Sequence, residues 1–255
     1  MSRYWSLVCA VTVYLSSFGI ASAACDANVW REYAGIKLWK FAGSDAYFYA
    51  TPQMDIDADG APNAYHPKDI GIDALGNAGF PNGGWKNVLV VDPDDPSRPF
   101  VQTSGDFAGY FVSKTSLQDK TLPATDPSRY VDARVVSYIV FPGAFFAIKG
   151  TGDYGDFAVV RNLSNDKQSS AIVADGGPQN APLGEVSVGL AESLGGSHVN
   201  PRNGAGKPRG TFVYLIFPKS KANPAWPIAQ GQMDQQAGNR LAALGGWERI
   251  MACVQ

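Results

Sequence analysis

Short hydrophobic runs separated by glycine, proline and aspartate recur along most of the chain. These runs are rich in β-branched and aromatic residues, which favour strands over helices. The pattern predicts strands at 46–50, 85–91, 100–102, 109–113, 135–141, 157–160, 169–174 and 211–217. Residues 28–40 mix polar and hydrophobic residues without a regular period, so they predict no element.

Helical periodicity is confined to a few segments. Val188, Ala191 and Leu194 recur every three residues, which is typical of one face of a helix. Residues 73–79 predict a short helix, and a terminal helix is expected from Ile228 or Met233 to Leu244. Many short strands with two or three helices indicate a mostly β fold with helical additions (α+β), as a single-domain barrel or sandwich.

The first 24 residues have the features of a secretory signal peptide. Arg3 supplies a positive start, a hydrophobic core follows, and Ala21-Ser22-Ala23 is typical of a cleavage site. The hydrophobic run is too short for a membrane span. We therefore expect an exported chain of residues 25–255, free of the membrane once the signal 1–24 is removed.

Two cysteines, Cys25 and Cys253, lie at opposite ends of the expected mature chain, because Cys9 leaves with the signal. In an oxidising compartment they are expected to form a disulfide that joins the termini. The alternative is a lipoprotein acylated at Cys25, but the residues before it include no large aliphatic side chain.

The charge of the chain argues against a nucleic-acid partner. Removing the signal leaves 20 basic and 23 acidic residues, with no basic run. Phosphate-binding loops and the G-x-S-x-G motif are absent from the sequence, and the two histidines have no local metal-ligand partner. We expect no cofactor and no metal, which leaves carboxylate chemistry.

Residues 171–195 contain the strongest candidates for that chemistry, Asp175 and Glu185. Asp175 ends a hydrophobic run before Gly176-Gly177-Pro178, and Glu185 is expected at the start of the following helix. Desolvation at a strand end favours a neutral carboxyl, whereas a helix N-terminus favours an ionised one. Two carboxyls whose pKa values differ can serve as general acid and general base. Ordinary turn and capping roles are the alternative reading.

A second acidic motif, Met54-Asp-Ile-Asp-Ala-Asp-Gly60, places Asp55, Asp57 and Asp59 at alternate positions. It matches the first half of a calcium loop, but the twelfth position is His66 rather than glutamate. The alternating carboxylates can instead face a ligand or water.

These motifs together resemble the chitosanases of glycoside hydrolase family 75. The similarity includes 54–60 with Ala64-Tyr65, 152–160, Ala171 to Pro178, and Leu183-Gly184-Glu185-x-Ser187. It implies a six-stranded double-psi-like β-barrel and a secreted, inverting endo-hydrolase of chitosan. It further implies that Glu185 is the proton donor and Asp175 the carboxylate that activates water. The turn from Gly177 to Pro182 differs from the commoner family form.

The resemblance also suggests how a cationic polysaccharide would bind. Asp55, Asp57 and Asp59 are expected to pair with its ammonium groups, and the rings of Tyr65, Trp85 and Trp226 to stack on sugars unless they belong to the core. We expect a monomer whose partner is chitosan or a related amino sugar polymer such as peptidoglycan. A non-catalytic carbohydrate-binding protein of the same fold is the alternative.

Overall fold

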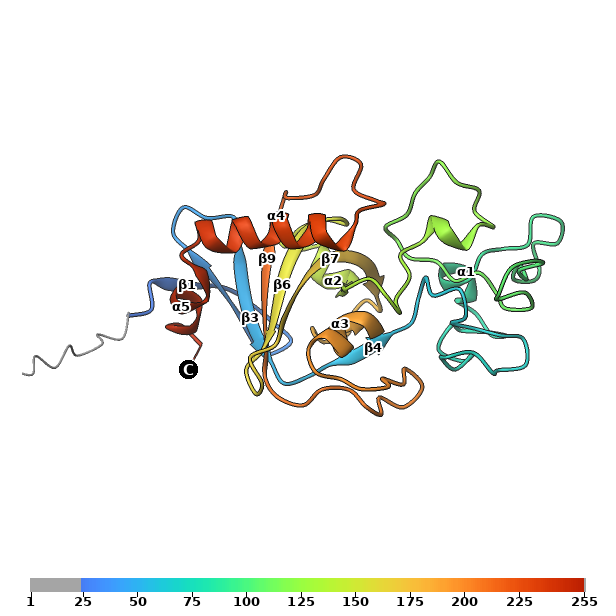
Figure 1. The fold of residues 1–255 in the computed structure, drawn as a ribbon, viewed down its shortest axis with the longest axis horizontal. Helices are drawn as coiled ribbons and strands as arrows, with labels where there is room; N and C mark the ends of the chain where they lie inside the picture. Colours follow the sequence, from blue (N-terminus) through green and yellow to red (C-terminus); the bar gives the residue numbers. More distant parts are fainter. Residues whose placement is uncertain (1–23, 255) are drawn as a thin grey trace, which may run out of the picture.

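The computed structural model describes residues 24–254, so the predicted signal peptide lies outside the described residues except for Ala24. A nine-stranded mixed sheet forms its centre, in the order β1-β2-β3-β9-β6-β7-β5-β8-β4 (Figure 1). The strands are β1 (Ala27–Tyr33), β2 (Ile36–Phe41), β3 (Tyr47–Thr51), β4 (Asp55–Asp57), β5 (Tyr138–Pro142), β6 (Phe157–Asn162), β7 (Gln168–Gly177), β8 (Glu185–Ser187) and β9 (Phe212–Phe217). The mostly β class with helical additions is therefore confirmed.

Both faces of the central strands are buried. Along β9, Val213 and Leu215 belong to one hydrophobic cluster, and Tyr214 and Ile216 belong to the other. Because successive side chains point to opposite faces, every residue of this strand contributes to a core. Burying a large hydrophobic side chain stabilises a fold by about 1.5–3 kcal/mol. All six residues at 212–217 are buried, so this strand contributes strongly to the stability of the sheet.

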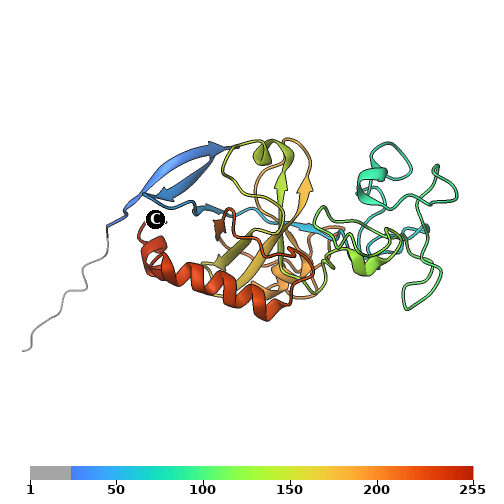
Figure 2. The ribbon, with the colours of Figure 1, turned by 90° about the horizontal axis from the view of Figure 1, so that it is seen from above.

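Helices cover the two faces of the sheet. α4 (Gln230–Ala243) packs on β6 and β7, and α5 (Gly246–Met251) follows it (Figure 2). α2 (Gly143–Phe146) and α3 (Val188–Ser193) contribute Phe145 and Leu190 to the opposite face. Val188, Ala191 and Leu194 are all buried, which confirms the predicted face of α3.

The sheet is open, and closure into a six-stranded barrel is not confirmed. The pairing ends at β1 on one side and at β4 on the other. β4 and β8 have three residues each and pair with one another in parallel, too short to continue the ladder around a barrel. The β1–β2 hairpin instead extends the sheet beyond β3.

That hairpin was not predicted from the sequence. Its turn residues Ala34 and Gly35 both have positive φ, as a two-residue hairpin turn requires. Most of its side chains are only partly buried or exposed, so its sequence lacks a hydrophobic run. Pairing with β3, rather than its own hydrophobic pattern, holds it in the sheet.

Loops dominate the segment between β4 and β5, which forms the right-hand end of the molecule in Figures 1 and 2. Four predicted elements there are wrong. Residues 85–91 contain the short helix α1 (Trp85–Val88), and 73–79 contain only turns. Residues 100–102 and 109–113 make only isolated bridges, such as Val101 with Phe111. Single backbone hydrogen bonds, such as that from the Gly109 N–H to the Gln102 C=O, do not continue into longer ladders.

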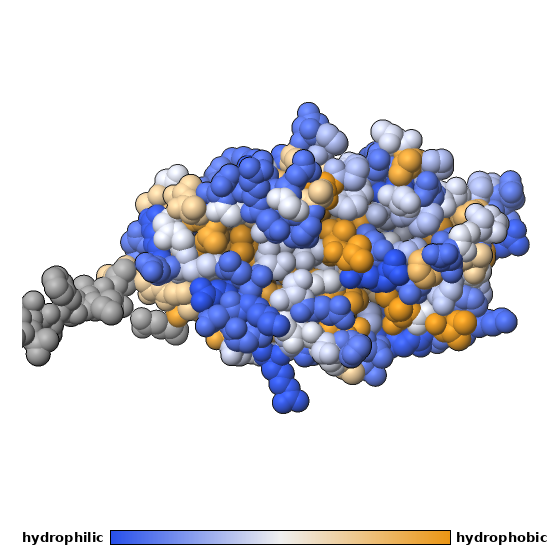
Figure 3. Space-filling model, viewed as in Figure 1, coloured by the Kyte–Doolittle hydropathy of each residue, from blue (hydrophilic) through white to orange (hydrophobic). Residues whose placement is uncertain are grey.

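The predicted disulfide joins Cys25 to Cys253, whose Cα atoms lie 4.6 Å apart. Close by, Arg249 on α5 forms an ion pair with Asp26 at 2.6 Å. Within residues 24–254, the structure contains no helix long and apolar enough to cross a membrane. Figure 3 shows that hydrophobic side chains on one face are gathered in small patches among hydrophilic ones.

Candidate active site

Strand β5 lies between β7 and β8, the two strands that bear the candidate catalytic carboxyls. It pairs in parallel with β7, which sets Val140 opposite Asp175, and antiparallel with β8, which sets Ile139 opposite Val186. Asp175 and Glu185 line one cavity of about 430 Å³. Two carboxyls that are ten positions apart in the sequence therefore face the same space.

Asp175 is 8% exposed and firmly oriented. Its Oδ1 accepts hydrogen bonds from the Ser116 hydroxyl at 2.6 Å, the Ser116 N–H at 3.0 Å and the Gly176 N–H at 2.7 Å. Burial raises the pKa of Asp175 to about 6, although these hydrogen bonds oppose the rise. With Oδ1 occupied by three donors, Oδ2 is the oxygen left for a water molecule.

Glu185 lies on strand β8 and not at the start of a helix, so the expected helix-dipole effect does not apply to it. The cap of α3 is Ser187, whose hydroxyl accepts from the Leu190 N–H. Burial raises the pKa of Glu185 to about 7, and the negative charge of Asp175 adds to the rise. The neutral acid is therefore the form favoured below neutral pH.

The last residue of β7, Gly177, leaves room for the Glu185 carboxyl. A Cβ atom at Gly177 would lie only 2.8 Å from Glu185 Oε2. The end of β7 thus approaches the candidate acid so closely that a side chain would not fit between them. Glycine is needed at this position for the observed approach.

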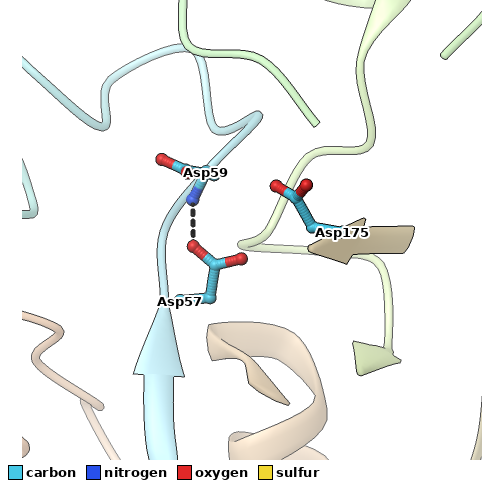
Figure 4. Close-up of side chains that lie close together, drawn as sticks. All are labelled: Asp57, Asp59 and Asp175. Carbon is cyan, nitrogen blue, oxygen red and sulfur yellow. Dashed lines mark hydrogen bonds between the residues drawn. The ribbon is translucent and has the colours of Figure 1, made fainter. Parts of the chain in front are cut away.

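The D-x-D-x-D-G motif brings two further carboxyls to the cavity. Asp57, Asp59 and Asp175 each present an oxygen within 4.8 Å of the other two (Figure 4). Asp57 accepts the Asp59 N–H at 2.8 Å and the Tyr138 hydroxyl at 3.0 Å. Burial raises the pKa of Asp57 and that of Asp59 well above the usual range. The negative charges of Asp175 and Glu185 raise both pKa values further, and that of Asp59 also raises the pKa of Asp57.

Such a cluster can share protons or hold a cation. Carboxylate oxygens suit a hard ion such as Ca²⁺, and these three residues are the ones among 24–254 that could ligate it. The expectation of no metal and no cofactor stays a prediction.

Tyr65 lies at the same cavity, but as a buried hydrogen-bond donor. It is 3% exposed, and its hydroxyl donates to Asp59 Oδ1 at 2.9 Å and to Asp73 Oδ2 at 3.2 Å. Asp55 is exposed and pairs in register with Glu185 on the neighbouring strand. Of the predicted binding residues, Asp57, Asp59 and Tyr65 line the cavity with the candidate catalytic pair, Asp175 and Glu185.

The two tryptophans are not at this cavity. Trp85 is 7% exposed and packs in the core beside Phe80, the alternative that the sequence had left open. Trp226 lines a separate hollow with Phe107 and Tyr130. Neither ring is positioned to stack on a sugar between Asp175 and Glu185.

Sequence reasoning missed the residues that orient the carboxyls. Ser116 lies in none of the predicted elements, and Tyr138 was predicted only as part of the strand 135–141. Ser113 donates to Asp59 Oδ1 at 3.0 Å from a loop 54 residues away. The one available signal was Tyr138, since a tyrosine in a fully hydrophobic strand needs a partner for its hydroxyl.

Comparison with known proteins agrees with this geometry. A search of curated proteins found no matching relative. A family model described as "Fungal chitosanase of glycosyl hydrolase group 75" matches residues 54–244, which include both carboxyls and the D-x-D-x-D-G motif. Because the match extends over most of the chain, this protein belongs to the chitosanase family of glycosyl hydrolase group 75.

Proposed function

We propose that the protein is a secreted endo-acting hydrolase that cleaves β-1,4 linkages in chitosan with inversion of configuration. Membership of the family implies glycoside hydrolase activity on chitosan. The observation that carries the finer proposal is the shared cavity of Asp175 and Glu185, in which burial raises the pKa of Glu185 above that of Asp175. The group with the higher pKa is the better proton donor at neutral pH.

In the proposed mechanism Glu185 donates its proton to the glycosidic oxygen as the bond to the anomeric carbon breaks. Asp175 Oδ2 accepts a proton from a water molecule whose oxygen bonds to the anomeric carbon from the opposite side. Inversion requires the two carboxyls to lie about 6.5–9.5 Å apart, so that this water fits between sugar and base. Ser116 and Gly176 hold Asp175 in place through its other oxygen.

Substrate binding is proposed to rest on the remaining carboxyls. Asp57 and Asp59 face the cavity, and exposed Asp55 stands beside Glu185, so ammonium groups of chitosan would meet several acceptors. A pair with exposed Asp55 contributes only about 0–1 kcal/mol, so it acts together with the carboxyls in the cavity.

Export and the boundaries of the catalytic part belong to the same proposal. Residues 1–24 would be removed as a signal, and residues 25–255 would form the monomeric catalytic domain. The Cys25–Cys253 disulfide supports an oxidising destination outside the cell or in a periplasm.

The experiment measures hydrolysis of partly acetylated chitosan by the mature protein, as the rate at which reducing ends are released. Glu185→Gln removes the proton but keeps the shape, and we expect activity to fall by about a hundredfold or more. Glu192→Gln is the matched control, because Glu192 is exposed on α3 and lies outside the cavity lining. NMR of the first-formed product identifies its anomer, which shows whether the configuration is inverted.

Equal activity of wild type and Glu185→Gln would contradict the role of Glu185. Retention of configuration would contradict the water-activating role of Asp175. If the wild type binds chitosan without cleaving it, the non-catalytic carbohydrate-binding protein becomes the better account, and peptidoglycan is the next substrate to test.

A further inference from the structure

Two cavities of about 500 and 510 Å³ lie on the surface outside the cavity of Asp175 and Glu185, and both include Val135 in their walls. Val135 is 70% exposed, an unusual state for a large hydrophobic side chain. We call these two neighbouring cavities together the Val135 groove.

The Val135 groove is separate from the candidate active site. The two share no lining residue among those described. The groove includes Ser169 and Ser170 at the start of β7, whereas Asp175 lies near its end. Six residues of strand separate Ser169 from Asp175, or roughly 20 Å at 3.3 Å per residue. A ligand in the groove would therefore leave the catalytic cavity free.

One half of the groove is lined by hydrogen-bonding side chains. Ser169 and Ser170 contribute hydroxyls from β7, with buried Ser137 behind Ser169, and Gln230 and Asp234 line the same cavity from α4. The Ser137 and Ser169 hydroxyls lie 3.0 Å apart, and Gln230 donates to Asp234 at 2.9 Å. Short polar groups of this kind match the hydroxyls of a sugar.

The other half has hydrophobic rings. Phe107 and Trp226 are half-buried in its wall, where the start of α4 and the loop before it face the green loops of Figure 1. The Trp226 ring suits a sugar ring, which has both apolar faces and polar edges, whereas the Phe107 ring is covered on one face by the Arg134 guanidinium. Trp226, which the sequence predicts to bind substrate, would do so in this groove rather than at the cavity of Asp175 and Glu185.

The groove carries negative charge. Asp106 and Asp234 line it without an ion pair, and none of its described lining residues is lysine or arginine. The third carboxylate, Asp132, is neutralised by Arg134 at 2.7 Å, and that guanidinium also lies over the Phe107 ring. The remaining charge is complementary to a cation and not to an anion.

We propose that the Val135 groove binds a second stretch of the cationic amino sugar polymer, outside the catalytic cavity. The identity of this occupant rests on the proposed function, since the family acts on chitosan. Binding at two places on one chain increases retention on a long polymer without any change at the catalytic carboxyls.

The test measures binding of fully deacetylated chitosan in the Glu185→Gln background, where cleavage is suppressed. Asp106→Lys with Asp234→Lys reverses both groove charges at exposed positions. Two lost exposed pairs are worth about 1 kcal/mol or more together, so we expect polymer binding to weaken by about fivefold or more. Asp94→Lys with Glu32→Lys is the control, with the same change in charge at exposed positions outside the groove.

The same charge reversals in the active protein complete the test. The KM for long chitosan should rise, while hydrolysis of a short glucosamine oligosaccharide that fills only the catalytic cavity should not change. Equal affinity for the polymer in the groove and control variants would overturn the proposal. An equal loss of hydrolytic activity on the polymer and on the oligosaccharide would also overturn it. If the wild type never cleaves chitosan but groove-dependent binding persists, the proposed function fails and the groove proposal stands.

Discussion

Ser116→Ala removes the shortest of the three hydrogen bonds that Asp175 Oδ1 accepts, the one from the hydroxyl at 2.6 Å. That bond stabilises the ionised carboxylate, so its loss must raise the pKa of Asp175 above about 6. Hydrogen bonds to charged groups are worth about 1.5–3 kcal/mol. Ser116 is exposed, so water compensates in part, and we take about 1.4 kcal/mol, which brings the pKa of Asp175 to about 7.

The consequence for activity follows from the two protonation states that the mechanism needs. With pKa values of about 6 for Asp175 and about 7 for Glu185, about 60% of molecules at pH 6.5 have an ionised base and a protonated acid. At pH 6.5 that fraction falls from about 60% in the wild type to about 20% in Ser116→Ala. At pH 5 it falls from about 9% to about 1%. At pH 8 it stays near 9%, because there the acid limits the rate.

The assay is kcat/KM on a soluble chitosan oligosaccharide between pH 4.5 and 8.5. We expect a tenfold loss at pH 5, a threefold loss at pH 6.5 and almost none at pH 8. Ser116→Thr keeps the hydroxyl and should restore the wild-type profile. Equal losses at pH 5 and pH 8 would refute the reasoning, because they would show damage to the site and no change in the pKa of Asp175.

Three further substitutions test other parts of the site and fold. Gly177→Ala places a Cβ 2.8 Å from Glu185 Oε2 and should lower kcat by about tenfold or more with little change in Tm. The control is Gly83→Ala, whose Cβ meets no atom within 4 Å and should leave kcat unchanged. Burial raises the pKa of Asp57 above its unfolded value, so the folded state is destabilised as pH rises above about 4, and Asp57→Asn should raise Tm more at pH 8 than at pH 4. Asp156 is 0% exposed and accepts four backbone N–H groups, so Asp156→Ala should cost about 3 kcal/mol or more in urea unfolding.

Each of these three has an outcome that contradicts it. Full activity in Gly177→Ala would show that the Glu185 carboxyl can move without loss. A Tm gain for Asp57→Asn that is the same at both pH values would mean that ionisation of Asp57 is not what destabilises the fold. Unchanged stability of Asp156→Ala, compared with exposed Asp166→Ala as the control, would show that water replaces the carboxylate between the loops.

The local pattern of the sequence was sufficient for the elements that bury their own side chains. The runs that became β6, β7 and β9 are hydrophobic on both faces, and α3 shows its buried face as a period of three. The Asp175 and Glu185 pair was identified from its motif, because a carboxyl after a hydrophobic run is visible in the letters alone. The disulfide followed from the position of two cysteines at the two ends of the expected mature chain.

Only the tertiary structure decided how those elements meet. β8 has three residues, and only its pairing with β5 and β4 shows that Glu185 lies on a strand rather than on a helix. The helix α1 and the β1–β2 hairpin depend on contacts with other segments, such as Lys114 with Val88 of α1 and β3 with β2, which override weak local preferences. Ser116 reaches Asp175 across 59 positions, and no local pattern encodes such a contact, because it arises from the packing of loops against strand ends. The sequence by itself therefore determined which carboxyls are present, and the packing determined their pKa values and partners.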